Sequence, residues 1–291
     1  MGSSPLIPRL SPPFNTAPAA RFLFRFRQNR LALAACGVLV VVIVAATAAP
    51  VLAPYDPAYI NLDNQVLAPS PEHLFGTDRL GRDVFSRVLW GARVSLGVSL
   101  VAVTLGSAVG ILLGATAGYG SATADAVISR AVDVMLSLPT FFLLIVIQSL
   151  FPPSTMNVAL IIGATSWMAL ARIVRGQFLT LKGREFVEAA RALGAGPVRI
   201  VFRHLLPSAT SQIIVFFTLG LADAVLVESA LSFLGLGVPA YQASWGNMLN
   251  DGQISILSGS WWVALFPGLM ILLTALSMNF VGDGLQESLF T

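Results

Sequence analysis

The sequence predicts an all-α membrane protein that crosses the bilayer with six helices and carries a polar two-helix segment between the fourth and the fifth. Hydrophobic residues make up 56% of the 291-residue chain and charged residues only 11%, whereas soluble domains carry about 25% charged residues. The mean hydropathy is +0.80. Several apolar runs also approach the ~20 residues that a helix needs to span a bilayer.

Charge and cysteine content argue against two other classes of protein. The net charge is +3, but lysine and arginine cluster at the flanks of the apolar runs, so the charge does not indicate a nucleic-acid partner. The single cysteine, Cys36, lies inside an apolar run, which rules out a disulfide framework within the chain.

We expect residues 1–30 to form a cytosolic tail. Residues 1–20 are rich in Pro, Ser and Ala and look disordered. The stretch 21–30 interleaves Phe with Arg, which is typical of an interfacial helix or a basic flank. The first span covers 31–53. A cleavable signal peptide is the alternative, because Ala45–Ala49 is rich in small residues, but the apolar run exceeds the usual ~7–15-residue signal core.

Residues 54–93 form a polar excursion that we expect outside the cytoplasm, with an amphipathic helix. Glycine allows tight turns there, and Asp83 is placed to cap the following helix. Arg82, Asp83 and Arg87 are spaced to pair within one helical turn. The motif residues in this excursion are Gly76, Asp78, Gly81, Arg82, Asp83, Arg87 and Arg93.

The core region, 94–291, contains the other five spans. We expect these spans at about 94–117, 131–150, 158–173, 211–236 and 261–281. Pro139 predicts a kink in the third span, and Asp133 is placed to form a local ion pair with Arg130. Glycine recurs every four residues in the second span, which predicts close packing of a neighbouring helix. These glycines are Gly106, Gly110, Gly114 and Gly118.

Between the fourth and fifth spans lies a basic interval, 182–207, which predicts two short amphipathic helices. In each helix four apolar residues repeat at i, i+3, i+4 and i+7 and so share one face. The two sets are Phe186, Ala189, Ala190 and Leu193, then Val198, Val201, Phe202 and Leu205. Gly194 stands where a helix ends in a left-handed residue, Pro197 suits a first helical position, and Pro207 closes the unit.

Glu188-Ala189-Ala190, the following Gly194 and Leu206-Pro207 resemble the EAA loop of permease subunits of ABC importers. In that family the loop docks into a cleft on the cytosolic ATPase, and one departure here is His204, where an aliphatic residue is common. The resemblance implies a coupling role for Arg184, Glu185, Phe186, Val187, Glu188, Ala189, Ala190, Leu193, Gly194, Leu206 and Pro207.

Further stretches are similar to one subclass, the second permease of dipeptide, oligopeptide and nickel importers. These stretches are 73–96, 228–237, 244–248, 266–268 and 279–285. The resemblance implies a type I ABC importer permease fold in the lipid of the cell (inner) membrane. It also implies a related second permease, two cytosolic ATPases that bind ATP and Mg, an extracytoplasmic substrate-binding protein and a peptide substrate. Nickel or glutathione remains an alternative substrate.

Polar residues inside the predicted spans are candidates for the translocation pathway. Asp223 and Glu228 lie within the fifth span, and Ser166 and Trp167 within the fourth. Intramembrane carboxylates are costly, so they line a cavity or pair with another group. Two interpretations stay open: a polar pathway, or hydrogen bonds to the partner subunit. A secondary transporter driven by protons through the two carboxylates is a more distant alternative.

Basic residues set the expected orientation. The N-terminal flank holds five of the 17 basic residues, and the interval from Arg172 to Arg203 holds seven. Six spans place both regions on one side, which the positive-inside rule makes cytosolic, together with both termini. Motifs for ATP binding, zinc proteases and serine hydrolases are missing from the sequence, so we expect no catalytic, cofactor or metal site and no nucleic-acid partner. A membrane enzyme is therefore the least supported class.

Overall fold

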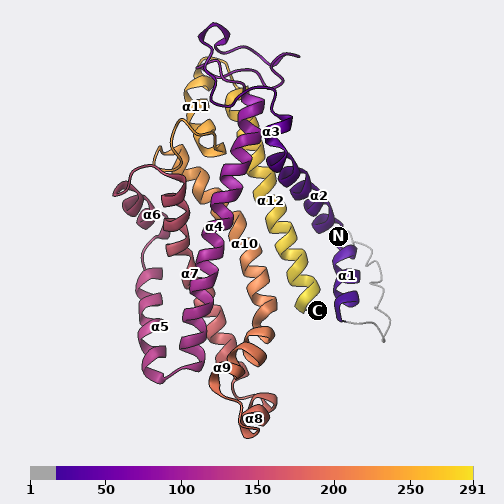
Figure 1. Cartoon of the computed structure of the whole chain (residues 1–291), viewed down its shortest axis with the longest axis vertical. Helices are drawn as coiled ribbons and strands as arrows, with labels where there is room; N and C mark the ends of the chain where they lie inside the picture. The colour runs from indigo at the N-terminus through magenta and orange to yellow at the C-terminus, as the bar shows by residue number, and fades with distance from the viewer. Residues whose placement is uncertain (1–17, 291) are drawn as a thin grey trace, which may run out of the picture.

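The computed structural model describes residues 18–290, which form a bundle of long helices without a β-strand (Figure 1). Five stretches are long and apolar enough to cross a membrane, and a bent helix pair makes a sixth. The helices that cross are α2 (Arg30–Thr47), α4 (Val84–Tyr119), α7 (Thr155–Leu181), α10 (Leu206–Phe233) and α12 (Trp262–Phe290), with α5 (Ala122–Leu136) and α6 (Thr140–Ser149) as the bent pair. The prediction of an all-α, polytopic fold is confirmed.

The N-terminal part consists of three helices in series. They are α1 (Pro18–Gln28), α2 and α3 (Ala49–Leu52). The side chain of Asn29 accepts a hydrogen bond from the Ala32 amide at 3.0 Å and so caps α2. Phe26 and Ala32 pack against Gly284 near the end of α12. The predicted first span is therefore a helix with a short continuation after Ala48. Of the residues predicted to be disordered, 1–20, the first 17 lie outside the described residues, and the prediction is wrong for 18–20, which form the start of α1.

Helix α4 begins ten residues before the predicted second span. Asp83 caps it, because its carboxylate accepts a hydrogen bond from the Ser86 amide at 2.7 Å. The amphipathic helix and the second span are therefore one helix of 36 residues. At 1.5 Å per residue it is ~54 Å long, so it extends well beyond a hydrocarbon core of ~30 Å.

The longest helix interface joins α4 to α7 through the glycine ridge. A Cβ on Gly114 would stand 2.6 Å from the Ala171 carbonyl oxygen and 2.8 Å from the Val174 Cβ. A Cβ on Gly118 would stand 2.6 Å from the Phe178 Cβ. These distances are shorter than any real carbon contact, so the missing side chains let the two backbones touch.

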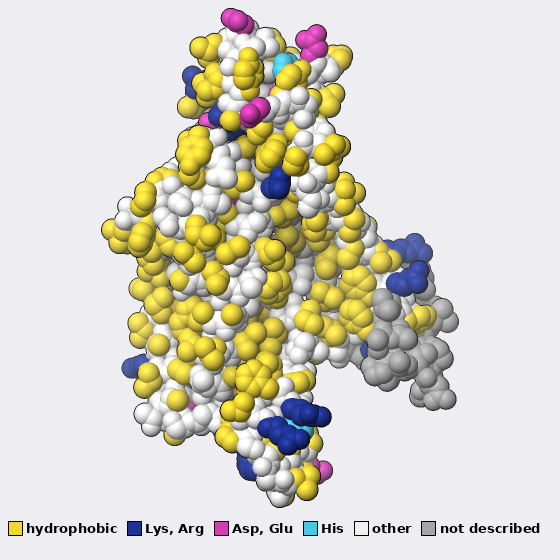
Figure 2. Space-filling model, in the orientation of Figure 1, with side chains coloured by type: hydrophobic (Ala, Val, Ile, Leu, Met, Phe, Trp, Pro, Cys, Tyr) yellow, Lys and Arg dark blue, Asp and Glu magenta, His cyan; other side chains and the backbone are white. Residues whose placement is uncertain are grey.

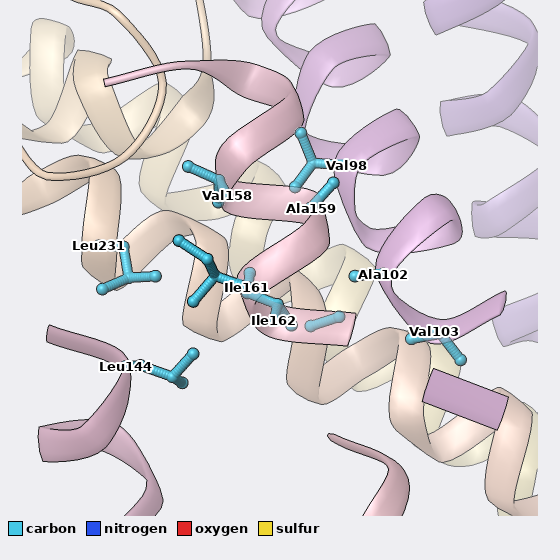
Figure 3. Packing of buried hydrophobic residues seen from close by; sticks show 10 residues of the cluster. Val98, Ala102, Val103, Leu144, Val158, Ala159, Ile161, Ile162 and Leu231 are labelled. Carbon is cyan, nitrogen blue, oxygen red and sulfur yellow. The ribbon is translucent and has the colours of Figure 1, made fainter. Parts of the chain in front are cut away.

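The core beside this ridge joins four helices. Figure 3 shows Val98 and Ala102 on α4, Val158 on α7, Leu144 on α6 and Leu231 on α10 pointing toward a common centre. All are nearly inaccessible to solvent. This packing fixes α10 relative to the α4–α7 pair, and α10 carries the two predicted intramembrane carboxylates.

The predicted third span is broken rather than kinked at Pro139. Helix α5 ends at Leu136, and α6 starts at Thr140 with its axis turned by 86°. Proline lacks an amide donor and disfavours the α conformation in the residue before it. The helix therefore stops at this point, and the chain turns sharply.

The local ion pair predicted between Asp133 and Arg130 is wrong. Asp133 instead accepts a hydrogen bond from Arg172 on α7 at 2.7 Å, and Asp125 pairs with Arg175 on the same helix. These ion pairs form because α5 packs on α7, and the spacing of the residues in the sequence did not indicate them.

Replacing Gly114 with valine is expected to destabilise the bundle by about 1–3 kcal/mol, because the new side chain overlaps the α7 backbone. The measurement is the midpoint of thermal unfolding of the purified protein in detergent. Gly37→Val is the matched control, since a Cβ on Gly37 meets nothing within 4 Å. Equal midpoints for the two variants would show that α4 and α7 do not depend on close backbone contact.

Candidate coupling and translocation site

The 182–207 interval forms a compact unit at the lower end of the bundle in Figure 1, which we term the loop end. Its helices are α8 (Glu185–Ala192) and α9 (Pro197–Ile200), followed by a π-helical turn, Val201–Leu205. Gly194 separates the helices with φ +81°. Its amide donates to the Arg191 carbonyl and the Ala195 amide donates to the Ala190 carbonyl, both at 3.0 Å, which is a Schellman motif. A left-handed glycine thus makes the predicted corner.

Helix α8 is held to the bundle by Val187 and by only one residue of the predicted apolar face, Ala190. Val187 is completely buried and Ala190 nearly so, against Phe178 of α7 and Ile200 of α9. The rest of the predicted face points outward. The exposed apolar residues of the loop end are Phe186, Leu193, Val198 and Phe202, with Ala189 beside them. The unit therefore keeps an apolar surface that no described residue covers.

The prediction that Pro207 closes the unit is also wrong. The π-helical turn runs directly into α10. An α-helical proline would clash with the carbonyl of residue 203, four positions earlier. A π-helical turn at this point, in which the Leu206 amide donates to the Val201 carbonyl, relieves that clash without ending the helix. The loop end and the span that follows it form one nearly continuous helical rod.

The opposite end of the bundle, which we term the cap end, comprises residues 54–83 and α11 (Trp245–Leu257). Gly76 and Gly81 adopt φ +73° and +71° there. A Cβ on Gly76 would stand 2.7 Å from the indole nitrogen of Trp262, and that nitrogen donates to the Thr77 carbonyl at 3.1 Å. The turns therefore fold the excursion tightly onto the start of α12.

A buried ion cluster joins the parts of the cap end. Asp78 accepts from Arg82 at 2.7 Å and lies 3.6 Å from the Arg87 guanidinium. Both arginines also reach Asp251 of α11, at 2.8 and 3.4 Å. Asp83 pairs instead with His73, at 2.9 Å. The predicted pairing among Arg82, Asp83 and Arg87 is therefore wrong.

Asp251 is the member of the cluster that sequence reasoning missed. It stands 169 residues from Arg82 along the chain, and its own neighbours form no motif. Arg93, the last residue of the predicted motif, does not join the cluster. It is exposed, and its guanidinium lies over the Trp90 ring at 4.9 Å from the centroid.

Glu228 is fully buried inside the chain and is surrounded by hydroxyl groups. Ser232 donates to it at 2.8 Å, and Ser229 lies 3.4 Å away. Ser95 of α4 and Ser244, the residue that caps α11, also lie beside the carboxylate. The contacts link α10, α4 and α11. This placement favours helix-to-helix bonding within the chain over exposure to a pathway or to a partner.

The other three predicted pathway residues are not brought together. Ser166 contacts Gly106, and the Trp167 backbone carbonyl lies against Gly110, so both belong to the α4–α7 interface. Asp223 lies on the outward face of α10 and is exposed. Within residues 18–290 it accepts no hydrogen bond and forms no ion pair. It is the one predicted pathway residue that faces away from the rest of the chain.

Comparison with known families decides the identity of the chain. The model of the binding-protein-dependent transport system inner membrane component matches residues 110–290, which include the loop end and the α7–α12 region. The chain belongs to this family. A second model, the N-terminal TM domain of oligopeptide transport permease C, matches residues 18–69.

Relatives of this permease cover almost all of it. The dipeptide transport system permease protein DppC of Bacillus subtilis is 42% identical over 91% of this chain and 83% of its own length. The glutathione transport system permease protein GsiD of Escherichia coli is 40% identical over 97% and 93%. A peptide permease protein of Brucella suis is 42% identical over 95% and 92%.

A solved structure of the MetNI methionine ABC transporter, in an inward-facing conformation, shares the fold of this permease. The TM-score is 0.55 at 19% sequence identity, over 68% of this chain and 93% of the MetNI chain. The predicted type I importer fold is thereby confirmed.

Replacing Asp78 with asparagine is expected to destabilise this permease by about 3 kcal/mol, because two buried arginines then share the single carboxylate of Asp251. The unfolding midpoint in detergent measures the effect. Asp63→Asn is the control, since Asp63 is exposed in the same excursion. A midpoint unchanged by Asp78→Asn would mean that the cluster contributes no stability.

Proposed function

We propose that this permease forms half of the transmembrane pathway of an ATP-driven importer of di- or oligopeptides. The observation that carries the proposal is the loop end, where an uncovered apolar surface sits on a glycine corner and continues into a membrane-spanning rod. The names of the relatives, which include dipeptide and oligopeptide permeases, support the substrate class. The other half of the pathway is a related second permease.

The remaining partners follow from the same proposal. Two cytosolic ATPases bind ATP and Mg and dock on the loop end, and a substrate-binding protein delivers the peptide at the cap end. The chain itself is not the enzyme, because ATP hydrolysis belongs to the ATPase subunits. Exposed apolar side chains such as Leu193, which is 89% exposed, suit a partner cleft better than they suit water.

We place the loop end and both termini on the cytosolic side of the inner membrane. Figure 2 shows lysine and arginine side chains gathered around α8 and α9 and near α1, while the middle of the visible face is mostly apolar. Basic residues concentrate on the cytosolic side of membrane proteins. The charge distribution therefore supports docking of the ATPase at the loop end and of the binding protein at the cap end.

The continuous rod suggests how docking is coupled to transport. When the ATPases close, they displace α8 and α9. Because Val187 packs on α7 and the π-helical turn continues into α10, the displacement passes to both spans. Tilting of α7 and α10 against the second permease would open the shared cavity to one side and then to the other.

Glutathione is the second candidate substrate, because GsiD is about as similar to this chain as DppC is. The two candidates differ in the ligand of the binding protein and share the mechanism.

The proposal is tested by affinity purification of the tagged permease from its native membrane, followed by reconstitution into liposomes. A second permease and two ATPases are expected to co-purify. The complex should take up a dipeptide only with ATP and a peptide-loaded binding protein. Uptake driven by a proton gradient without ATPases would contradict the proposal. Uptake of glutathione but not of dipeptides would show that glutathione, and not a di- or oligopeptide, is the substrate.

Gly194→Val is expected to abolish coupling, because a β-branched residue rarely adopts the left-handed conformation at φ +81°. Uptake should fall at least tenfold, and stimulation of ATP hydrolysis by the loaded binding protein should disappear. Gly183→Val is the matched control in the same loop, since Gly183 has no positive φ and a Cβ there meets nothing within 4 Å. Normal uptake by Gly194→Val would remove the glycine corner from the mechanism.

A further inference from the structure

Two carboxylates lie within the described spans, away from the charged helix ends, and both are on α10. They are Asp223 and Glu228. Glu228 accepts hydrogen bonds from Ser232 and Ser229, has two further serines beside it and is 0% exposed. Asp223 is exposed, with no hydrogen bond or ion pair among residues 18–290. Glu228 therefore has its hydrogen-bond partners within the chain, whereas Asp223 faces outward without one among the described residues.

The depth of Asp223 excludes contact with bulk water outside the bilayer. It precedes the end of α10 at Phe233 by ten residues, so the two are ~15 Å apart along the axis. Phe233 reaches the cap end, because its carbonyl accepts from the Asn250 side chain at 2.6 Å. In a hydrocarbon core of ~30 Å, Asp223 lies close to the midplane.

Lipid is an unsuitable environment for this side chain. A carboxylate that faces hydrocarbon near the midplane is strongly disfavoured, and the neighbouring outward residue, Leu226, is 45% exposed and apolar. The side chain therefore faces a water-filled pathway, a cation or a polar group of the partner subunit.

We propose that Asp223 faces the translocation pathway and binds the protonated α-amino group of the transported peptide. This inference rests on the proposed function. A peptide of any sequence presents one ammonium group at its amino end, and an ammonium–carboxylate hydrogen bond is charge-assisted and strong. A single carboxylate attracts that end and repels the carboxyl end, so it orients the peptide without reading its side chains.

The first test compares variants of the reconstituted complex, with the binding protein saturated with a dipeptide. Asp223→Asn is expected to lower uptake about tenfold, as loss of a charged hydrogen bond predicts, and Asp223→Glu to restore most of it. Stimulation of ATP hydrolysis by the loaded binding protein should persist in both. Leu226→Asn, on the same outward face, is the matched control and should stay within about twofold of the original rate.

The second test restores the charge chemically. In a Cys36→Ser background, Asp223→Cys is treated in the assembled complex with a water-soluble methanethiosulfonate that carries either a carboxylate or an amine. Recovery of uptake with the carboxylate reagent alone supports the proposal. Failure of both reagents to label the thiol would place the residue against the partner permease and overturn the proposal, as would recovery with both reagents or with neither.

Failure of this inference is distinguishable from failure of the proposed function. If the unmodified complex shows no ATP-dependent uptake of peptide, the proposed function fails. If it shows such uptake and Asp223→Asn equals it, only the role of Asp223 fails.

Discussion

The membrane offers no water to a charged group, and this constraint explains why the ionisable side chains that the described bundle buries are paired or hydrogen-bonded. Asp78, Arg82, Arg87 and Asp251 neutralise one another at the cap end. Near the opposite end, Asp125 and Asp133 pair with arginines of α7. Between these two groups of ion pairs, the carboxylate of Glu228 is buried at a tolerable cost in free energy because hydroxyl donors replace water. Hydrogen bonding and pairing thus determine which helices must meet.

Apolar attraction between helices is weak in lipid, so close packing has to hold the bundle together. The glycine ridge of α4 supplies that contact with α7, and the cluster in Figure 3 adds α6 and α10. Hydrogen bonds then hold α11 to α4. The backbone amide of Trp245 donates to the Ser95 hydroxyl, and its indole nitrogen donates to the Val88 carbonyl. The result is a rigid frame with its least supported helices at the loop end.

Composition and local motifs were sufficient to predict the spans, the glycine corner and the Asp83 cap, because each depends on neighbours in sequence. Contacts between distant segments were not predictable in this way. Asp251 has no local signal, and its arginine partners are known only once α11 folds over α4. The burial of Val187 was not predicted, for a related reason. Helical spacing identifies an apolar stripe around Phe186, but a docking surface and a core surface are equally apolar, and only packing shows that Val187 is the buried residue.

The two ends of the molecule are stabilised by different kinds of interaction, and the difference suits alternating access. Ion pairs and hydrogen bonds at the cap end depend on direction and distance, so a shift of about an ångström is costly. The loop end rests on apolar contacts of Val187, Ile200 and Leu205, which are non-directional and tolerate sliding. A force applied to α8 and α9 therefore moves the lower half of α10 more readily than its upper end. Asp223 lies between these two ends of the helix, where the tilting that we propose would change which side of the membrane its carboxylate reaches.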